Sequence, residues 1–242
     1  MSRPTADTLL EIDAISKRFG GFLALDRVSL RVRAGERLGL IGPNGSGKTT
    51  LINCVSGALP TDGGRILFEG RDITALPAHQ RTRLGIVRTF QIPKPFTSMT
   101  VLENLGIPLE YAAPARSHGV AAALDILRAI GLDAKAQLRP TGLTQIEMRK
   151  LELARAMAAR PKLLISDEAM AGLSSAEVDD ILTILFRLNE SGITIIMIEH
   201  IMRAVMRFSQ RVVVLDAGTR IAEGTPEEIV RNPAVEKAYL GE

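Results

Sequence analysis

The sequence predicts an α/β protein with a P-loop core, an antiparallel β subdomain and an inserted α-helical subdomain. Three observations indicate this class. A glycine-rich stretch at residues 42–50 lies between an apolar strand pattern and a helical pattern. Short apolar runs alternate with helical patterns over much of the chain, as they do in parallel sheets. Three helical patterns between residues 100 and 159 follow one another directly and interrupt that alternation.

Residue patterns predict the elements in order. Alternating apolar and polar residues at 10–16 and 28–32 predict antiparallel strands, and the apolar run at 37–41 predicts a buried strand. Residues 49–56 then open a helix. Further strands are expected at 63–68, 70–73, 86–90, 163–166, 193–198, 211–215 and 220–222, and helices at 77–84, 100–111, 117–130, 144–159, 175–190, 226–231 and 234–239.

Length and composition fit one globular domain. The chain has 242 residues, of which 46% are hydrophobic, enough for a sizeable core. We expect one domain over residues 1–242, with the helical insertion at 92–160. The net charge is only +3, no run of Lys and Arg marks a nucleic-acid tail, and tryptophan is absent. A nucleic-acid partner is therefore not expected.

The N-terminus and the single cysteine bear on location. Residues 1–13 lack the apolar core of a signal peptide, and no apolar stretch reaches membrane-spanning length. Any membrane association is therefore expected to be peripheral. Cys54 cannot form an internal disulfide, and its place after the glycine-rich loop predicts a buried thiol in a reducing compartment, the cytoplasm by default.

The glycine-rich stretch matches GxxxxGK[ST], the phosphate-binding P-loop. Glycines let successive N–H groups turn inward onto phosphate oxygens, and the following helix adds the positive end of its dipole. Lys48 is expected to act as a catalytic group on the β- and γ-phosphates, and the Thr49 hydroxyl to hold Mg²⁺. The residues expected to bind nucleotide here are Gly42, Pro43, Asn44, Gly45, Ser46, Gly47, Lys48, Thr49 and Thr50.

Polar residues at strand ends are the next candidates, because parallel sheets bind ligands at the carboxyl ends of their strands. Asp167 ends an apolar strand and would hold the Mg²⁺ shell. Glu168 would orient and deprotonate the attacking water, and His200 would donate a hydrogen bond to the γ-phosphate. Gln91, before a proline-containing loop, would contact the same metal and water. Gln91 and His200 taken singly also fit a solvated loop residue and a strand-terminal histidine.

An aromatic residue upstream of a P-loop could stack on the adenine ring of a nucleotide. Phe19 is the candidate for that contact, although a core-filling phenylalanine is about as common at such a position.

The whole order of elements, from about Leu10 to the end, resembles the ATP-binding subunits of ABC transporters. The resemblance implies Walker A at 42–50, the Q-loop glutamine at Gln91, Walker B with its catalytic glutamate at 163–168, and the switch histidine at His200. Several dispersed peptides are similar to the branched-chain amino acid importer group: RTFQ at 88–91, MTVLEN at 99–104, AGL at 171–173, IAEGTPEEI at 221–229, NP at 232–233 and AYLG at 238–241.

The resemblance also implies an activity and partners. It implies ATP hydrolysis that drives uptake of branched-chain amino acids or related small solutes, at the cytoplasmic face of the membrane. The implied partners are two membrane-spanning permease subunits and, indirectly, a periplasmic or extracellular solute-binding protein. Two alternatives stay open: a soluble ABC-type ATPase not engaged in transport, and a nucleotide-binding regulatory subunit with little turnover.

One motif departs from the family pattern. The signature LSGGQ falls on LTQIE at 143–147, and the resemblance implies that ATP lies between the Walker residues of one subunit and the signature of another. Thr144 keeps a hydroxyl for nucleotide and forms a T-x-x-E capping box with Glu147. Gln145 and Ile146 deny the close backbone approach that glycine permits, and Glu147 brings a negative charge toward a polyanion. We therefore expect a heterodimer with a second ABC ATPase whose signature is intact.

Overall fold

The computed structural model describes residues 7–90, 92–112 and 119–240. Within them, a six-stranded sheet with the order β10-β9-β3-β8-β7-β6 forms the centre of the molecule. Its strands are parallel except for β10, which pairs antiparallel with β9. Helices cover this sheet, which explains why its strands are apolar runs rather than alternating patterns. The strands are β3 (Arg37–Ile41), β6 (Ile86–Arg88), β7 (Leu163–Asp167), β8 (Thr194–Ile198), β9 (Arg211–Asp216) and β10 (Thr219–Gly224).

A second, antiparallel sheet has the order β2-β1-β4-β5. Its strands are β1 (Thr8–Phe19), β2 (Phe22–Arg33), β4 (Gly63–Phe68) and β5 (Arg71–Asp72). The first two strands are longer than the alternating patterns at 10–16 and 28–32 predicted. Register shifts interrupt the alternation, and Ala14 and Arg27 have positive φ angles of 50° and 46°. The ladder nevertheless continues to Phe19 and Phe22 at the hairpin turn.

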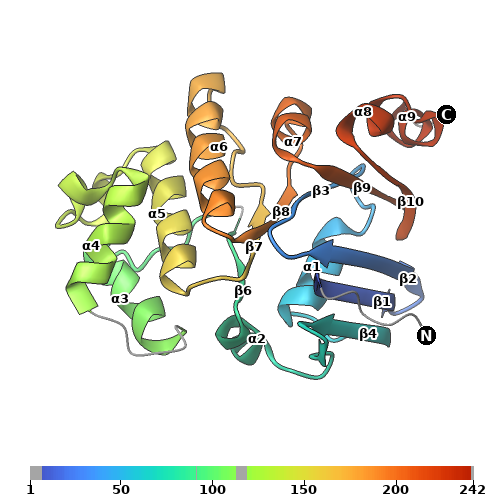
Figure 1. Cartoon of the computed structure of the whole chain (residues 1–242), viewed down its shortest axis with the longest axis horizontal. Helices are drawn as coiled ribbons and strands as arrows, with labels where there is room; N and C mark the ends of the chain where they lie inside the picture. The colour runs from blue at the N-terminus through green and yellow to red at the C-terminus, as the bar shows by residue number, and fades with distance from the viewer. Residues whose placement is uncertain (1–6, 91, 113–118, 241–242) are drawn as a thin grey trace.

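The helix α1 (Lys48–Ser56) lies between the two sheets, as Figure 1 shows. Its buried Leu51, Ile52, Cys54 and Val55 belong to a core cluster that draws residues from both sheets. The predicted burial of the Cys54 thiol is confirmed. The phosphate-binding loop at the start of α1 is thus fixed from both sides.

The other face of the parallel sheet is covered by helices from the second half of the chain (Figure 1). A second core cluster joins α6 and α7 to the strands of this sheet. The helix α2 lies near β6 and α1 instead. The helix α2 spans Ala78–Leu84. The helices from the second half of the chain are α6 (Ser175–Glu190), α7 (Met202–Phe208), α8 (Pro226–Val230) and α9 (Pro233–Leu240).

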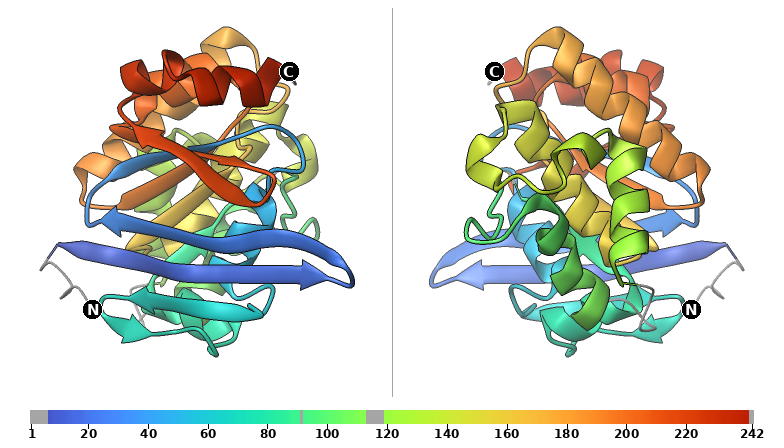
Figure 2. Two further views of the ribbon diagram at one scale, coloured as in Figure 1. Left: turned by 90° about the vertical axis from the view of Figure 1, so that its right-hand side faces the viewer. Right: turned by 90° about the vertical axis from the view of Figure 1, so that its left-hand side faces the viewer.

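Three further helices pack on one another and form a lobe beside the parallel sheet (Figures 1 and 2). They are α3 (Val101–Tyr111), α4 (Gly119–Ile130) and α5 (Gln145–Ala158). Short 3₁₀ turns at Asp133–Lys135 and Pro140–Gly142, which the sequence patterns did not predict, connect α4 to α5. A connection of four residues leads from the C-terminal end of α5 to β7.

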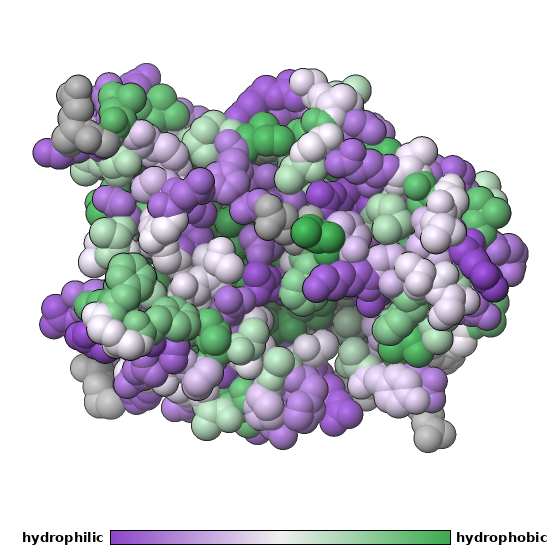
Figure 3. Space-filling view, turned by 180° about the vertical axis from the view of Figure 1, so that it is seen from behind, coloured by the Kyte–Doolittle hydropathy of each residue, from purple (hydrophilic) through white to green (hydrophobic). Residues whose placement is uncertain are grey.

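Surface properties complete the fold. None of the described helices is both long and apolar enough to span a bilayer. Hydrophilic and hydrophobic residues are interspersed over the face seen in Figure 3.

Candidate active site

The P-loop turns between β3 and α1 because its glycines adopt conformations closed to other residues. Gly42 has a φ of 149°, and a Cβ there would lie 2.0 Å from the Leu215 carbonyl oxygen. Gly47 has a φ of 101° and is the N-cap of α1, so no side chain covers the first N–H groups of that helix. These groups and the helix dipole form a site for anions.

The Lys48 ammonium folds back across the loop. It donates to the carbonyl oxygens of Gly42 at 2.7 Å and Pro43 at 3.0 Å. Burial lowers the pKa of Lys48, while the nearby Glu168 and Asp167 carboxylates act in the opposite direction. The ammonium is therefore close to both acidic residues that the sequence singled out.

Three predicted site residues lie at the carboxyl ends of β7 and β8. Asp167 is the last residue of β7, is buried, and pairs with Arg88 at 2.5 Å. Glu168 follows with a φ of 47°, and its backbone N–H donates to the Ile198 carbonyl oxygen at 2.9 Å. The His200 Nε2 lies 3.1 Å from Glu168 Oε1. The two loops that follow these strands thus bring a carboxylate and an imidazole together.

A pocket of about 260 Å³ unites these groups with the P-loop. Phe19 forms part of its wall and is 48% exposed, with the Lys17 ammonium 5.7 Å from the ring centroid. Phe22, which the sequence analysis did not select, lines the same pocket across the hairpin. Gln91 lies outside the described residues. The lining residues are Phe19, Phe22, Ala24, Asn44, Gly45, Ser46, Gly47, Lys48, Thr49, Thr50, Glu168 and His200.

Thr144 does not line this pocket; it caps α5 in the helical lobe. Its hydroxyl accepts from the Glu147 N–H at 3.4 Å, and the Glu147 carboxylate accepts from the Thr144 N–H at 2.9 Å. The negative charge that Glu147 brings to this end of α5 is paired with the Lys135 ammonium at 2.6 Å. This contact and the capping bond lower the pKa of Glu147.

Sequence reasoning missed three residues that support the site. Arg88 pairs with Asp167, and Glu199 accepts from the Met170 N–H at 2.9 Å in the loop after Glu168. Burial raises the pKa of Glu199 to about 7. Burial also raises the pKa of the Tyr239 phenol, while the Gly42 backbone of the P-loop acts in the opposite direction. Of these three residues, only Arg88 had a local signal in the sequence, because it is a charged residue within a predicted apolar strand.

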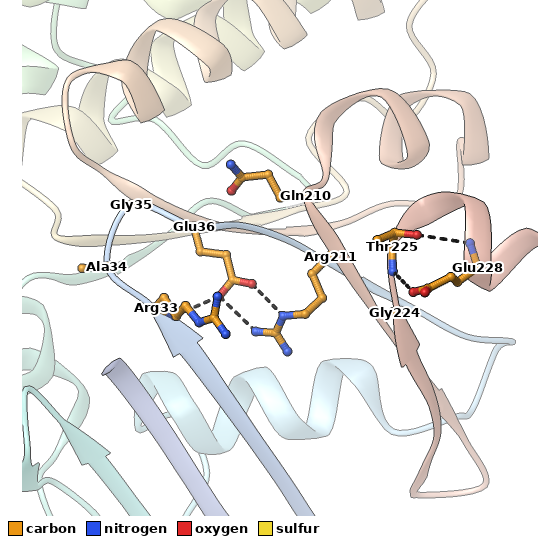
Figure 4. A pocket seen from close by; sticks show the side chains of 9 residues that line it. All are labelled: Arg33, Ala34, Gly35, Glu36, Gln210, Arg211, Gly224, Thr225 and Glu228. Carbon is orange, nitrogen blue, oxygen red and sulfur yellow. Dashed lines mark hydrogen bonds and ion pairs between the residues drawn. The ribbon is translucent and has the colours of Figure 1, made fainter. Parts of the chain in front are cut away.

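A larger pocket, of about 550 Å³, lies at the opposite ends of the strands (Figure 4). There Arg211 donates to Glu36 Oε1 at 2.7 Å and to Glu36 Oε2 at 3.0 Å. The same guanidinium contacts Glu223 and the Arg31 carbonyl oxygen. We therefore interpret this pocket as a structural junction.

The anion-binding loop, the buried aspartate and the glutamate–histidine pair together suit phosphoryl transfer to water. A carboxylate and a hydroxyl are hard oxygen ligands of the kind that Mg²⁺ takes, so Asp167 and Thr49 fit that ion. Fold and site thus define a nucleotide-binding protein of the P-loop class.

Comparison with known proteins gives the family. Residues 25–171 match the family model for ABC transporters, and residues 219–242 match the model for branched-chain amino acid ATP-binding cassette transporters. The chain belongs to the ATP-binding subunits of ABC transporters, in their branched-chain amino acid group. As the sequence predicted, it is the ATP-binding and ATP-hydrolysing subunit of such a transporter.

Individual relatives agree with this assignment. The chain is 39% identical over 258 aligned positions to the high-affinity branched-chain amino acid transport ATP-binding protein BraF of Pseudomonas aeruginosa, with 100% of both chains covered. It is 41% identical to LivG of Salmonella typhimurium over the same length and coverage. A nucleotide-free ATP-binding cassette from an ABC transporter superposes with a TM-score of 0.88 at 35% identity, covering 97% of this chain and 100% of that one. The expected fold class is confirmed.

Proposed function

We propose that this chain energises the uptake of branched-chain amino acids, or of chemically related small solutes, from the cytoplasmic face of a membrane. The carrying observation is the pocket that joins Lys48, Glu168 and His200, because it combines an anion cradle with a base. The full-length similarity to branched-chain amino acid transport proteins supports the solute class. Two permease subunits and a solute-binding protein complete the transporter.

The P-loop binds the phosphates of ATP. Backbone N–H groups of the loop and the first turn of α1 donate to the phosphate oxygens. Lys48 exchanges its two carbonyl acceptors, Gly42 and Pro43, for β- and γ-phosphate oxygens. Phe19 stacks on the adenine ring at the open side of the pocket.

Glu168 is the general base. Its carboxylate orients the attacking water and takes its proton. His200 Nε2, which lies 3.1 Å from that carboxylate in this structure, turns its N–H to the γ-phosphate when nucleotide is bound. Bound Mg²⁺ would polarise the γ-phosphate and offset the charge that develops there. Asp167, Thr49 and Gln91 are the residues of this chain that would hold the ion.

Replacement of Glu168 by Gln tests this assignment. It removes the base but keeps the size and a hydrogen-bonding oxygen, so ATP hydrolysis in the assembled complex should fall by a factor of about 100 or more. ATP binding should remain. The matched control is Glu190→Gln, an exposed glutamate at the end of α6. Unchanged turnover in the Glu168 variant would instead favour the regulatory subunit that the altered signature also allows.

A heterodimer is the proposed assembly. In two copies of this chain, the segment facing each nucleotide would be LTQIE, whose third and fourth residues, Gln145 and Ile146, carry side chains at the start of α5. Loss of close backbone donors to phosphate costs about 3 kcal/mol, or about a hundredfold in rate. A partner with an intact signature would complete the site that holds this chain's Lys48 and Glu168. Hydrolysis by this chain alone should therefore be far slower than hydrolysis by the mixed pair, and equal rates would refute the heterodimer.

A groove beside the helical lobe is the proposed contact with the permease. It has a volume of about 480 Å³ and lies between β6, α2, α3 and α5. Phe90, Phe96 and Tyr111 line it and are 52%, 40% and 62% exposed. We propose that the insertion at 92–160 moves as a unit and carries this movement to an apolar cytoplasmic helix of the permease. Phe96→Ser should uncouple hydrolysis from transport in proteoliposomes, while nucleotide binding stays unchanged.

A further inference from the structure

Arg88 lies where three elements meet. It is the last residue of β6, and its guanidinium donates to Asn53 Oδ1 on α1 and to Asp167 Oδ2 at the end of β7, both at 2.5 Å. The Arg88 side chain is 12% exposed and that of Asp167 is 8% exposed. The contact is therefore a charge-assisted pair shielded from water, not a surface ion pair.

The pair adjoins the groups that suit Mg²⁺. Thr49 and Asn53 are four residues apart on α1, so they share one side of that helix. Arg88 thus binds the residue one turn beyond Thr49 and, at the same time, the carboxylate of Asp167. A positive charge at this place compensates Asp167 and repels a divalent cation.

Arg88 depends on these two partners. Its Nε atom is buried and has no hydrogen-bond partner among the described residues, so the terminal nitrogens carry its polar contacts. The Phe90 ring centroid lies 5.5 Å from the guanidinium carbon. The guanidinium is fixed beside Asp167 at the cost of one unsatisfied donor.

We propose that Arg88 is a positioning residue that competes with Mg²⁺ for the Asp167 carboxylate. Without nucleotide, Arg88 neutralises Asp167 and holds it at the end of β7. When nucleotide and Mg²⁺ bind, the divalent cation must overcome this pairing, so Arg88 raises the Mg²⁺ concentration that the site requires. The inference rests on the proposed role of Asp167 toward Mg²⁺.

The test is a Mg²⁺ titration of metal-free protein at a constant concentration of a fluorescent ADP analogue. Arg88→Met keeps the length of the side chain and removes its charge. The Mg²⁺ midpoint of nucleotide binding should fall at least about tenfold, because the carboxylate loses its internal counter-ion. Arg88→Lys, which keeps the charge, should restore a midpoint near that of the wild type.

Arg155→Met is the matched control. Arg155 pairs with Glu152 at 3.0 Å and lies 5.1 Å from the Phe96 ring, which repeats the Arg88 arrangement away from the P-loop. The Mg²⁺ midpoint of nucleotide binding in Arg155→Met should equal that of the wild type.

An unchanged or raised midpoint in Arg88→Met overturns the proposal. Should that variant fail to fold, Asn53→Ala, which loosens Arg88, must lower the midpoint, and an unchanged value overturns the proposal equally. If Mg²⁺ has no effect on wild-type binding, or Thr49→Val does not raise the midpoint, the proposed metal site itself is wrong.

Discussion

Glu199 is a buried carboxyl group beside the catalytic loops. It is 2% exposed, and burial raises its pKa to about 7 even though the Met170 N–H donates to it. The folded protein therefore binds a proton more tightly at this residue than the unfolded chain does. The stability that the protonated Glu199 contributes is fully present below the pKa that this residue has in the unfolded chain. This stability is lost as the pH rises through about 7.

The prediction is a stability difference that depends on pH. Between pH 5 and pH 8, wild-type protein should lose up to about 3 kcal/mol of unfolding free energy relative to Glu199→Gln, since each pKa unit is worth about 1.4 kcal/mol. Urea unfolding at four pH values measures the difference. Glu190→Gln, on an exposed residue, serves as the control and should run parallel to the wild type. Parallel curves for Glu199→Gln would contradict the prediction.

Arg88 and Glu199, which sequence reasoning missed, share one property: their partners are distant in sequence. Arg88 pairs with Asp167 across 79 positions, and Glu199 binds the backbone of Met170 across 29. No local pattern reports such a pairing. The P-loop was recognisable because its chemistry depends on glycines at fixed spacing within one short segment.

At the scale of elements, the buried strands were predictable and the bulged ones less so. The apolar run at 37–41 matches β3, because a strand covered on both faces needs apolar residues throughout. The ends of β1 and β2 were missed, since their positive-φ residues and register shifts break the two-residue period. Element order follows from the sequence more directly than element length does.

The N-terminus of α5 is the element on which the proposed assembly depends. Gln145 and Ile146 occupy its first turn, and Gln145 Nε2 donates to the Ala171 carbonyl oxygen at 3.5 Å. Replacing both residues by glycine should restore close backbone approach to a phosphate and raise ATP hydrolysis by this chain alone at least about tenfold. Steady-state hydrolysis at equal protein concentration is the measurement.

The same double replacement should lower stability by about 2 kcal/mol, since each glycine within a helix costs about 1 kcal/mol relative to alanine. The control is Val120→Gly with Ala121→Gly, two exposed positions at the start of α4. The control should lose similar stability without a gain in hydrolysis. A gain in both variants would show that loosened helices, and not the signature, limit turnover.

At the scale of the whole molecule, the two sheets must keep a fixed position relative to each other for the P-loop to be held between them. Arg211 joins them at the ends opposite the P-loop (Figure 4). Its guanidinium contacts the Arg31 carbonyl oxygen on β2, Glu36 before β3, and Glu223 on β10. Glu36 is 8% exposed, so the ion pair between its carboxylate and Arg211 is shielded from water.

Arg211→Met should therefore destabilise the fold without touching the nucleotide site. We expect a loss of about 2–4 kcal/mol in unfolding free energy, somewhat below that for a fully buried pair because Arg211 is partly exposed. Glu36→Gln in the same chain should recover part of this loss, with a coupling energy of about 1–3 kcal/mol in the double-mutant cycle. ADP affinity, measured by calorimetry, should stay at the wild-type value in all three variants. Additive losses would mean that Arg211 and Glu36 stabilise the molecule separately, and a change in ADP affinity would mean that the junction of the sheets reaches the P-loop.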